Sequence, residues 1–327
     1  MIIAKKYLMD HQDKMLKAIR QKMAGTSLID EIAAVLNISY DAAHRRISQK
    51  SKFSMEEAIS LCTHYGLSMD GLFTASGKVI VEKTAEIRSL EDMETYLKQS
   101  AKNISGFSTM EGSKMYYSAK DLPLFYTVGG TLISKFKLYV WLNLLSGAQH
   151  QQPFEQFTVT RSLAEYGEAL RTVYHALEVH EIWNDTTINS SLQQVHYYFK
   201  AGLLSLANAL LLLDDLDAIL HTAEDRCCNG TGSYHLYYNE LLILNNNVLI
   251  TAEKQQALFV PYTMLGYFIT NDDTTCGNAL SFFKQQVKNS MALNSSGTRD
   301  RKIFFNRAAQ KIALYRQSMQ NETEMGF

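Results

Sequence analysis

A short segment near the start of the sequence gathers side chains that could bind a nucleic acid. Residues 44–52 contain four lysine or arginine residues and no acid. Arginine can donate paired hydrogen bonds to a guanine edge, and both residue types can neutralise phosphate. The candidate contact residues in and just before this segment are Ser39, Tyr40, Asp41, His44, Arg45, Arg46, Lys50 and Lys52. These residue types favour non-covalent recognition of a nucleic acid.

Two predicted helices joined by a tight turn would position these side chains. The first has an apolar face at helical spacing, formed by Ile29, Ile32, Ala33 and Leu36. Asn37 follows, and asparagine tolerates the left-handed backbone of a sharp turn better than most residues. Ser27 and Ser39 are suitable N-caps for the first and second helix. The second helix is expected to run to about residue 49, with Ala43 facing inward.

Three further helices are predicted around this pair. Residues 4–23 show helical spacing of apolar side chains, which predicts a helix before it. Ser54 and Glu57 fit a capping box, which predicts a helix start, and that helix should run through residue 65. Ser68 can cap a last short helix that ends near residue 73. We therefore expect a five-helix domain over residues 1–78.

The stretch from Leu28 to Ile47, LIDEIAAVLNISYDAAHRRI, resembles the helix-turn-helix of lambda-repressor-like (XRE) transcription regulators. The resemblance continues through residues 53–73, which look like the fourth and fifth helices of that family. It implies a recognition helix at about residues 39–49 that enters the major groove of DNA. Arg46 departs from the pattern, because the family often has an apolar residue there.

The resemblance also implies roles for single residues. Tyr40, Asp41, His44 and Arg45 would face the bases, and Arg45 could read the O6 and N7 atoms of guanine. The amides behind Ser39 could favour a phosphate. Phosphate contacts are expected from Arg46, Lys50 and Lys52. Four alternatives stay open. Asp41 could only complement the helix dipole, and His44 could be an ordinary surface residue. The basic run could be an ordinary solvated face, and the whole domain could bind a protein partner instead.

Composition supports a globular protein of two domains. The chain has 327 residues, of which 46% are hydrophobic and 20% charged, and its net charge is −1. The four cysteines have no metal-site or disulfide spacing, which favours reduced thiols in the cytoplasm. No signal peptide is expected, and the longest apolar run is too short for a membrane span.

Residues 79–104 are predicted to form a connector, including a helix from residue 89 with a short apolar stripe. This stripe could pack on the larger domain or form a dimer seam. Residues 105–327 are predicted to be a helix-rich α+β domain. Helices are expected at 131–145, 161–179, 187–225, 272–292 and 298–320. Extended segments are expected at 115–119, 124–128 and 257–269, and a β-hairpin at 236–251 that turns at the three asparagines 245–247.

The larger domain offers weak signals for chemistry. His180-Glu181 lacks the second histidine of a zinc-protease motif, and Gly230-Thr231-Gly232 stands before a strand instead of after one. We therefore expect no catalytic residue, no metal and no cofactor. Abundant aromatic residues could form core, or line a pocket for a small-molecule effector. The basic residues within 284–316 could pair with the acidic segment 155–225, or contact DNA or an anionic ligand.

The sequence thus predicts a mainly α, non-enzymatic transcription regulator. Its first domain would bind DNA, and its second would supply dimerisation to a homodimer, effector sensing, or both. One alternative is an interaction module whose repressor-like domain recruits a protein partner. Another is an enzyme that carries an accessory DNA-binding domain.

Overall fold

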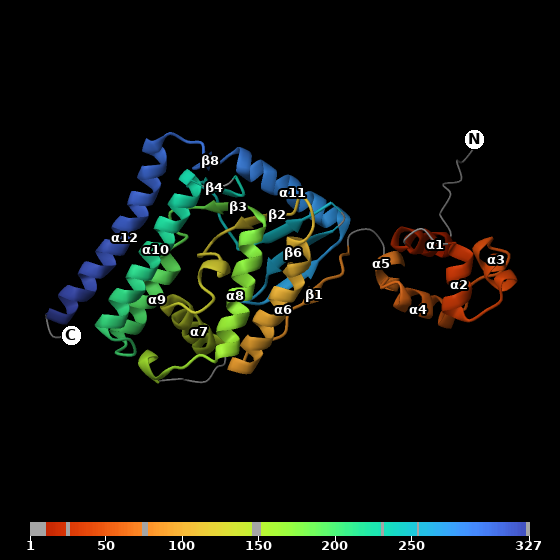
Figure 1. Ribbon diagram of the computed structural model, residues 1–327, viewed down its shortest axis with the longest axis horizontal. Coiled ribbons are helices and arrows are strands. Elements are labelled where there is room, and N and C mark those ends of the chain that lie inside the picture. Colours follow the sequence, from red (N-terminus) through yellow and green to blue (C-terminus); the bar gives the residue numbers. More distant parts are fainter. Residues whose placement is uncertain are drawn as a thin grey trace, which may run out of the picture. The chain divides into compact units, whose positions relative to one another are not determined.

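A computed structural model describes residues 11–23, 27–73, 78–145, 152–229, 232–253 and 255–324. The chain divides into two compact units, Met1–Ile80 and Val81–Phe327 (Figure 1). Each unit has its own hydrophobic core. They are described separately below.

The first unit is built from short helices around a small core. They are α1 (His11–Lys22), α2 (Leu28–Leu36), α3 (Tyr40–Ile47), α4 (Met55–His64) and α5 (Met69–Phe73). The buried core consists of Met15, Leu16, Ile19, Ile32, Ala43, Leu61 and Cys62. The five expected helices are present, although residues 4–10 of the first prediction lie outside the described residues. α3 ends two residues earlier than expected, and Gln49 adopts a positive φ of 60° just after it.

The second unit contains an eight-stranded mixed sheet in the order β1-β7-β6-β5-β2-β3-β4-β8. Its strands are β1 (Glu82–Lys83), β2 (Lys114–Ser118), β3 (Glu178–Trp183), β4 (Tyr234–Tyr238), β5 (Val248–Thr251), β6 (Gln256–Pro261), β7 (Tyr267–Thr270) and β8 (Met291–Ala292). β2, β3 and β4 are parallel neighbours, joined by helical crossovers. β5, β6 and β7 form an antiparallel meander beside β2.

Helices cover both faces of this sheet, because its inner strands carry apolar side chains on both sides. One face packs on the larger core, which includes residues of α6 (Leu90–Ser108), α7 (Leu132–Leu145), α8 (Arg161–Ala176), α9 (Asn189–Lys200), α10 (Leu206–Asn229) and α12 (Thr298–Glu324) (Figure 1). The opposite face packs on α11 (Asp273–Lys288) through Tyr116, Leu249 and Phe283. The unit is therefore helix-rich with a mixed sheet, and its strand content exceeds the sequence prediction.

The hairpin predicted at residues 236–251 is wrong. β4 pairs with β3 and β8, whereas β5 pairs with β2 and β6. Asn246 does have a positive φ of 61°, as a tight turn requires. Its side-chain oxygen, however, accepts hydrogen bonds from the amides of Lys120 and Asp121, at 2.8 and 3.2 Å. The asparagines thus fix a loop across the end of β2 instead of reversing the chain between paired strands.

Five other predicted segments need correction. The helix expected at 272–292 ends at Lys288, and Met291 and Ala292 form strand β8. Residues 187–225 form two helices, because Gly202 ends α9 with a positive φ of 67°. Residues 177–179 leave helix α8 and begin strand β3. Residues 257–269 contain two strands, and the amide of Tyr262 closes the turn between them by donating to the oxygen of Gly266. Residues 124–126 are a short 3-10 turn (Leu124–Tyr126) instead of a strand.

The predicted connector belongs largely to the second unit. Glu82 and Lys83 form β1, the edge strand that pairs with β7. The apolar stripe of α6 is buried, with Met93, Leu97 and Ile104 at most 5% exposed. Of the two interpretations of this stripe, packing within the large unit is the one that the structure supports.

Candidate nucleic-acid interface

The turn between α2 and α3 has the geometry expected from its sequence. Asn37 adopts a left-handed conformation, with φ 51° and ψ 48°. The amide of the next residue, Ile38, donates to the oxygen of Ala33 at 3.0 Å, which closes the end of α2. Ser39 then caps α3, since its hydroxyl accepts from the amide of Ala42 at 3.3 Å. In contrast, Ser27 has the backbone of an N-cap but makes no capping hydrogen bond with its side chain.

α3 has one face in the core of the unit and one face in solvent. Ala43 and Ile32 are fully buried, and α3 packs on α2 there. Seven of the eight candidate contact residues are exposed: Ser39, Tyr40, Asp41, His44, Arg45, Lys50 and Lys52. Tyr40 keeps 55% of its surface accessible, which is high for a large aromatic side chain. The structure therefore brings these candidates together on one helix and the loop that follows it.

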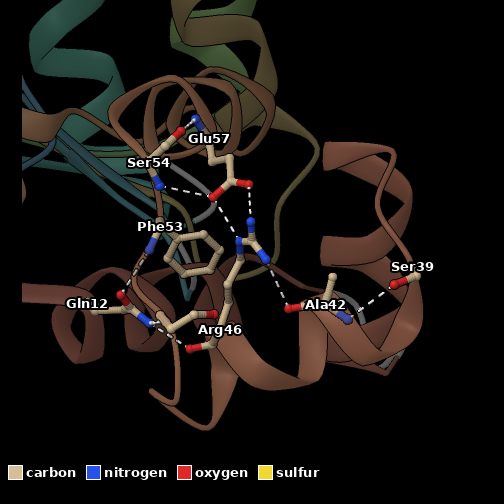
Figure 2. A network of polar contacts seen from close by, with 8 residues as sticks. Gln12, Ser39, Ala42, Arg46, Phe53, Ser54 and Glu57 are labelled. Atoms are coloured by element: carbon tan, nitrogen blue, oxygen red, sulfur yellow. Dashed lines mark hydrogen bonds and ion pairs between the residues drawn. The ribbon is translucent and has the colours of Figure 1, made fainter.

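Arg46 is the exception, and its expected contact with phosphate needs correction. Its guanidinium makes a two-pronged ion pair with Glu57 of α4, at 2.6 Å from Nη2 to Oε1 and 2.8 Å from Nε to Oε2 (Figure 2). Nη1 also donates to the oxygen of Ala42 at 3.2 Å. The side chain is only 21% exposed. A two-pronged pair fixes both planar groups, so Arg46 joins α3 to α4 instead of facing outward.

The Glu57 carboxylate accepts hydrogen bonds both from Arg46 and from the backbone at the start of α4. The expected capping box is present, because Ser54 Oγ accepts from the amide of Glu57 at 3.2 Å and Glu57 Oε2 accepts from the amide of Ser54 at 3.0 Å (Figure 2). The same carboxylate accepts from Arg46. These contacts, the Arg46 hydrogen bond first among them, lower the pKa of Glu57 although burial opposes them. The start of α4 and the middle of α3 are thus held by one carboxylate.

Gln12 holds the loop that carries Lys50 and Lys52. From α1, its Nε2 donates to the oxygens of Arg46 and Ser51 at 2.6 and 3.2 Å, and its Oε1 accepts from the amide of Phe53 at 3.2 Å (Figure 2). Gln12 is 7% exposed, so these contacts satisfy a buried amide. Sequence reasoning did not assign this role to Gln12. A polar residue at a core position of an amphipathic helix was the available signal.

The second unit buries a carboxylate among hydrogen-bond donors. Glu181 is fully buried, and its carboxylate accepts hydrogen bonds from Tyr174 at 2.5 Å, Trp183 at 2.9 Å, and both Tyr126 and Tyr234 at 3.2 Å. Burial raises the pKa of Glu181. Four hydroxyl and indole donors therefore account for this carboxylate, which satisfies a group that would otherwise be costly to bury.

The neighbouring histidines also have partners. His180 Nε2 lies 2.9 Å from Glu178 Oε1, its Nδ1 lies 3.2 Å from the Tyr237 hydroxyl, and its ring stacks on that of His235. Burial lowers the pKa of His180. Glu178, His180 and His235 are close enough to hold a metal ion. However, the ammonium of Lys114 already lies 2.8 Å from the Glu178 carboxylate, which reduces the attraction of this group for a cation.

The basic C-terminal helix pairs with the acidic middle segment, as the first of the two interpretations predicted. Arg316 of α12 lies 2.6 Å from Asp214, and Lys302 lies 2.8 Å from Glu224. Arg307 approaches Asp185 at 3.4 Å. These three pairs join the C-terminal helix to the acidic middle segment within one unit.

No family, curated protein or solved structure matched the chain in comparisons with known proteins. Within the described ranges, no helix is both long and apolar enough to cross a membrane.

Proposed function

We propose that this protein is a sequence-specific DNA-binding transcription regulator whose α3 enters the major groove. The observation that supports this most directly is the division of α3 into two faces. Ala43 packs inward and Arg46 pairs with Glu57, while Tyr40, His44 and Arg45 are exposed. A rigid helix with an exposed polar face at its start suits direct contact with base edges.

The proposed roles follow from position. Arg45 lies in the second turn of α3, where a guanidinium can pair with one guanine. Lys50 and Lys52 follow the helix on the loop held by Gln12, and they are assigned to phosphates. Ser39 presents the helix start, where the amides favour a phosphate oxygen. Asp41 has the wrong sign for phosphate, and its proposed role is to stabilise the helix start.

A homodimer completes the proposal, because one such unit covers only one half-site on DNA. The second unit is assigned to dimerisation and to sensing. The proposed regulator is non-enzymatic and acts in the cytoplasm, which agrees with its four free cysteines.

Two substitutions distinguish base reading from phosphate binding. Preferred sites are first selected from random duplexes, and the affinity of the full chain is then measured on a preferred and a scrambled duplex at several salt concentrations. Arg45→Ala should cost about 1–3 kcal/mol on the preferred site and reduce discrimination at one base pair. Lys52→Ala should weaken binding to both duplexes equally and reduce the slope of log affinity against log salt by about one.

A matched control is Arg161→Ala, which removes a charge from a side chain that is 93% exposed on α8 of the second unit. It should change neither affinity nor slope. If Arg45→Ala leaves specificity and affinity intact, α3 does not read the major groove. If the full chain has no DNA affinity, the proposal is wrong. Recruitment of a protein partner by this domain then replaces it.

A further inference from the structure

A cavity of about 340 Å³ lies in the second unit between the sheet and helix α6. This volume falls within the range of about 300–1,000 Å³ that is usual for small-molecule sites. Its floor is formed by the strands, including Met115 of β2, Ile250 of β5 and Ile269 of β7. Its opposite wall is α6, which contributes Tyr96 and Ser100. All of these residues belong to one compact unit.

The lining is mainly apolar, and it includes the phenol side chains of two tyrosines. Tyr117, which is 4% exposed, and Tyr267 both line the cavity. Burial raises the pKa of Tyr267 to about 12 and that of Tyr117 well above its usual value. Both phenols therefore stay neutral at physiological pH, and each can donate one hydrogen bond and accept another.

The charge of the lining is balanced. Among the lining residues, Glu82 and Lys83 carry the only formal charges, and these have opposite signs. Both are exposed residues of β1, at the edge of the sheet. Lys83 is also engaged by Glu86 at 3.7 Å and by the ring of Tyr262. A ligand with a net charge would lose its hydration here without gaining a counter-ion, which is unfavourable.

We infer that this cavity binds an uncharged, mainly apolar small molecule with a hydroxyl or carbonyl oxygen, which would bond to Tyr117 or Tyr267. The apolar part lies against the strands, and the oxygen atom satisfies a phenol in the interior. The site thus selects for neutral amphiphiles, such as an alcohol or a ketone with a medium-length alkyl chain, and against their charged analogues.

The cavity also touches the segment that leads from the first unit into the second. β1 is the first strand after the boundary near residue 80, and it pairs with β7 through only two residues, Glu82 and Lys83. A ligand that contacts residues 82–85 stabilises this short pairing and orders the start of the second unit. We assign the ligand a regulatory role on this basis. That assignment rests on the proposed function, whereas the binding itself does not.

The binding experiment uses the full chain and three probes of equal chain length: 1-decanol, decanoate and decylammonium. Melting of the second unit is followed by the fluorescence of Trp141 and Trp183, which are both in that unit. At 100 times its dissociation constant, a ligand should raise the melting temperature by about 5–10 °C. We expect such a shift with 1-decanol and none with the two charged probes. Equal shifts with all three would indicate adsorption to apolar surface, and no shift with 1-decanol would overturn the inference.

Two variants place the effect in the cavity. Ser100→Phe should fill the space next to Tyr96 and abolish the shift, whereas Ser105→Phe, on an exposed position of the same helix, should leave it unchanged. Tyr117→Phe keeps the shape and removes one hydroxyl, so affinity for 1-decanol should fall several-fold while affinity for decane does not. The inference is wrong if 1-decanol still protects Ser100→Phe, or if loss of the hydroxyl affects both probes equally.

A separate measurement tests regulation. DNA affinity of the full chain is compared with and without saturating 1-decanol, and a change that Ser100→Phe removes supports the regulatory role. Protection by 1-decanol with no DNA binding under any condition would refute the proposed function while leaving the cavity site in place. Protection with unchanged DNA affinity would refute only the regulatory role.

Discussion

The ion pair between Arg46 and Glu57 gives the sharpest test of how the first unit is built. Arg46→Ala removes two contacts to the carboxylate and one to the oxygen of Ala42. The two side chains are 21% and 18% exposed, which places the pair between a surface ion pair of about 0.2–1 kcal/mol and a buried one whose disruption costs about 3–5 kcal/mol. A coupling free energy of about 1–2 kcal/mol is expected from a double-mutant cycle with Glu57→Ala.

Hydrogen exchange of the full chain, resolved by peptide, measures this effect where it occurs. Loss of about 1.4 kcal/mol should speed exchange of the α3 and α4 amides about tenfold. Both tryptophans lie in the second unit. Melting of the second unit, followed by tryptophan fluorescence, is therefore an internal control, and Arg46→Ala should not change it. Glu57→Gln separates charge from capping, because glutamine can still complete the capping box with Ser54.

The pH dependence has a definite sign. The folded pKa of Glu57 is lowered, chiefly by the Arg46 hydrogen bond. The carboxylate therefore contributes stability above its unfolded pKa of about 4.3, and this contribution is lost as the pH falls below that value toward the folded pKa. Glu57→Gln should remove this dependence. The reasoning is refuted if Arg46→Ala leaves exchange unchanged but lowers the salt slope of DNA binding by one, because Arg46 would then be a phosphate contact.

Three other predictions concern the turn, the buried carboxylate and the assembly. Asn37→Gly should be nearly neutral, whereas Asn37→Val should destabilise the first unit by about 1–2 kcal/mol, since a β-branched residue is strained at φ 51°; equal amide exchange of the two variants would remove the turn assignment. Glu181→Ala should destabilise the second unit by about 3 kcal/mol or more in thermal unfolding and shift Trp183 emission, because four donors lose their acceptor; near-wild-type stability would contradict this. Sedimentation of the full chain at micromolar concentration should show a dimer, and a monomer that binds DNA as a monomer would exclude the proposed assembly.

Local features of the first unit could be predicted because contiguous residues encode them. The left-handed Asn37, the Ser39 cap and the capping box of Ser54 and Glu57 each involve groups at most five residues apart. Their hydrogen bonds form within a single turn of chain, so the residue types nearly determine the geometry. The same logic located the helix starts and the exposed face of α3.

The partners of Arg46 and Gln12 depended on the tertiary structure. Glu57 is 11 residues from Arg46, and Gln12 is 34 to 41 residues from the groups it binds. Sequence spacing showed a basic residue on a helix, but only the packing of α4 and α1 against α3 decided that Arg46 faces inward. Each of these polar groups could equally have been satisfied by water or phosphate if the helices had packed differently.

The sheet shows the same division, between features encoded by neighbouring residues and features decided by tertiary packing, more strongly. The β-prone run at residues 248–251 indicated a strand, but one of its two neighbours, β2, lies far away in the sequence. β5 lies beside β2, more than 130 residues earlier in the chain, since a strand with Leu249 and Ile250 fully buried must be covered on both faces and paired on both edges. The cavity under α6 likewise exists only where β1, β2, β5 and β7 meet that helix. The sequence by itself determined the local elements and the surface of α3, whereas long-range pairing, which is selected by burial of the whole core, decided the rest.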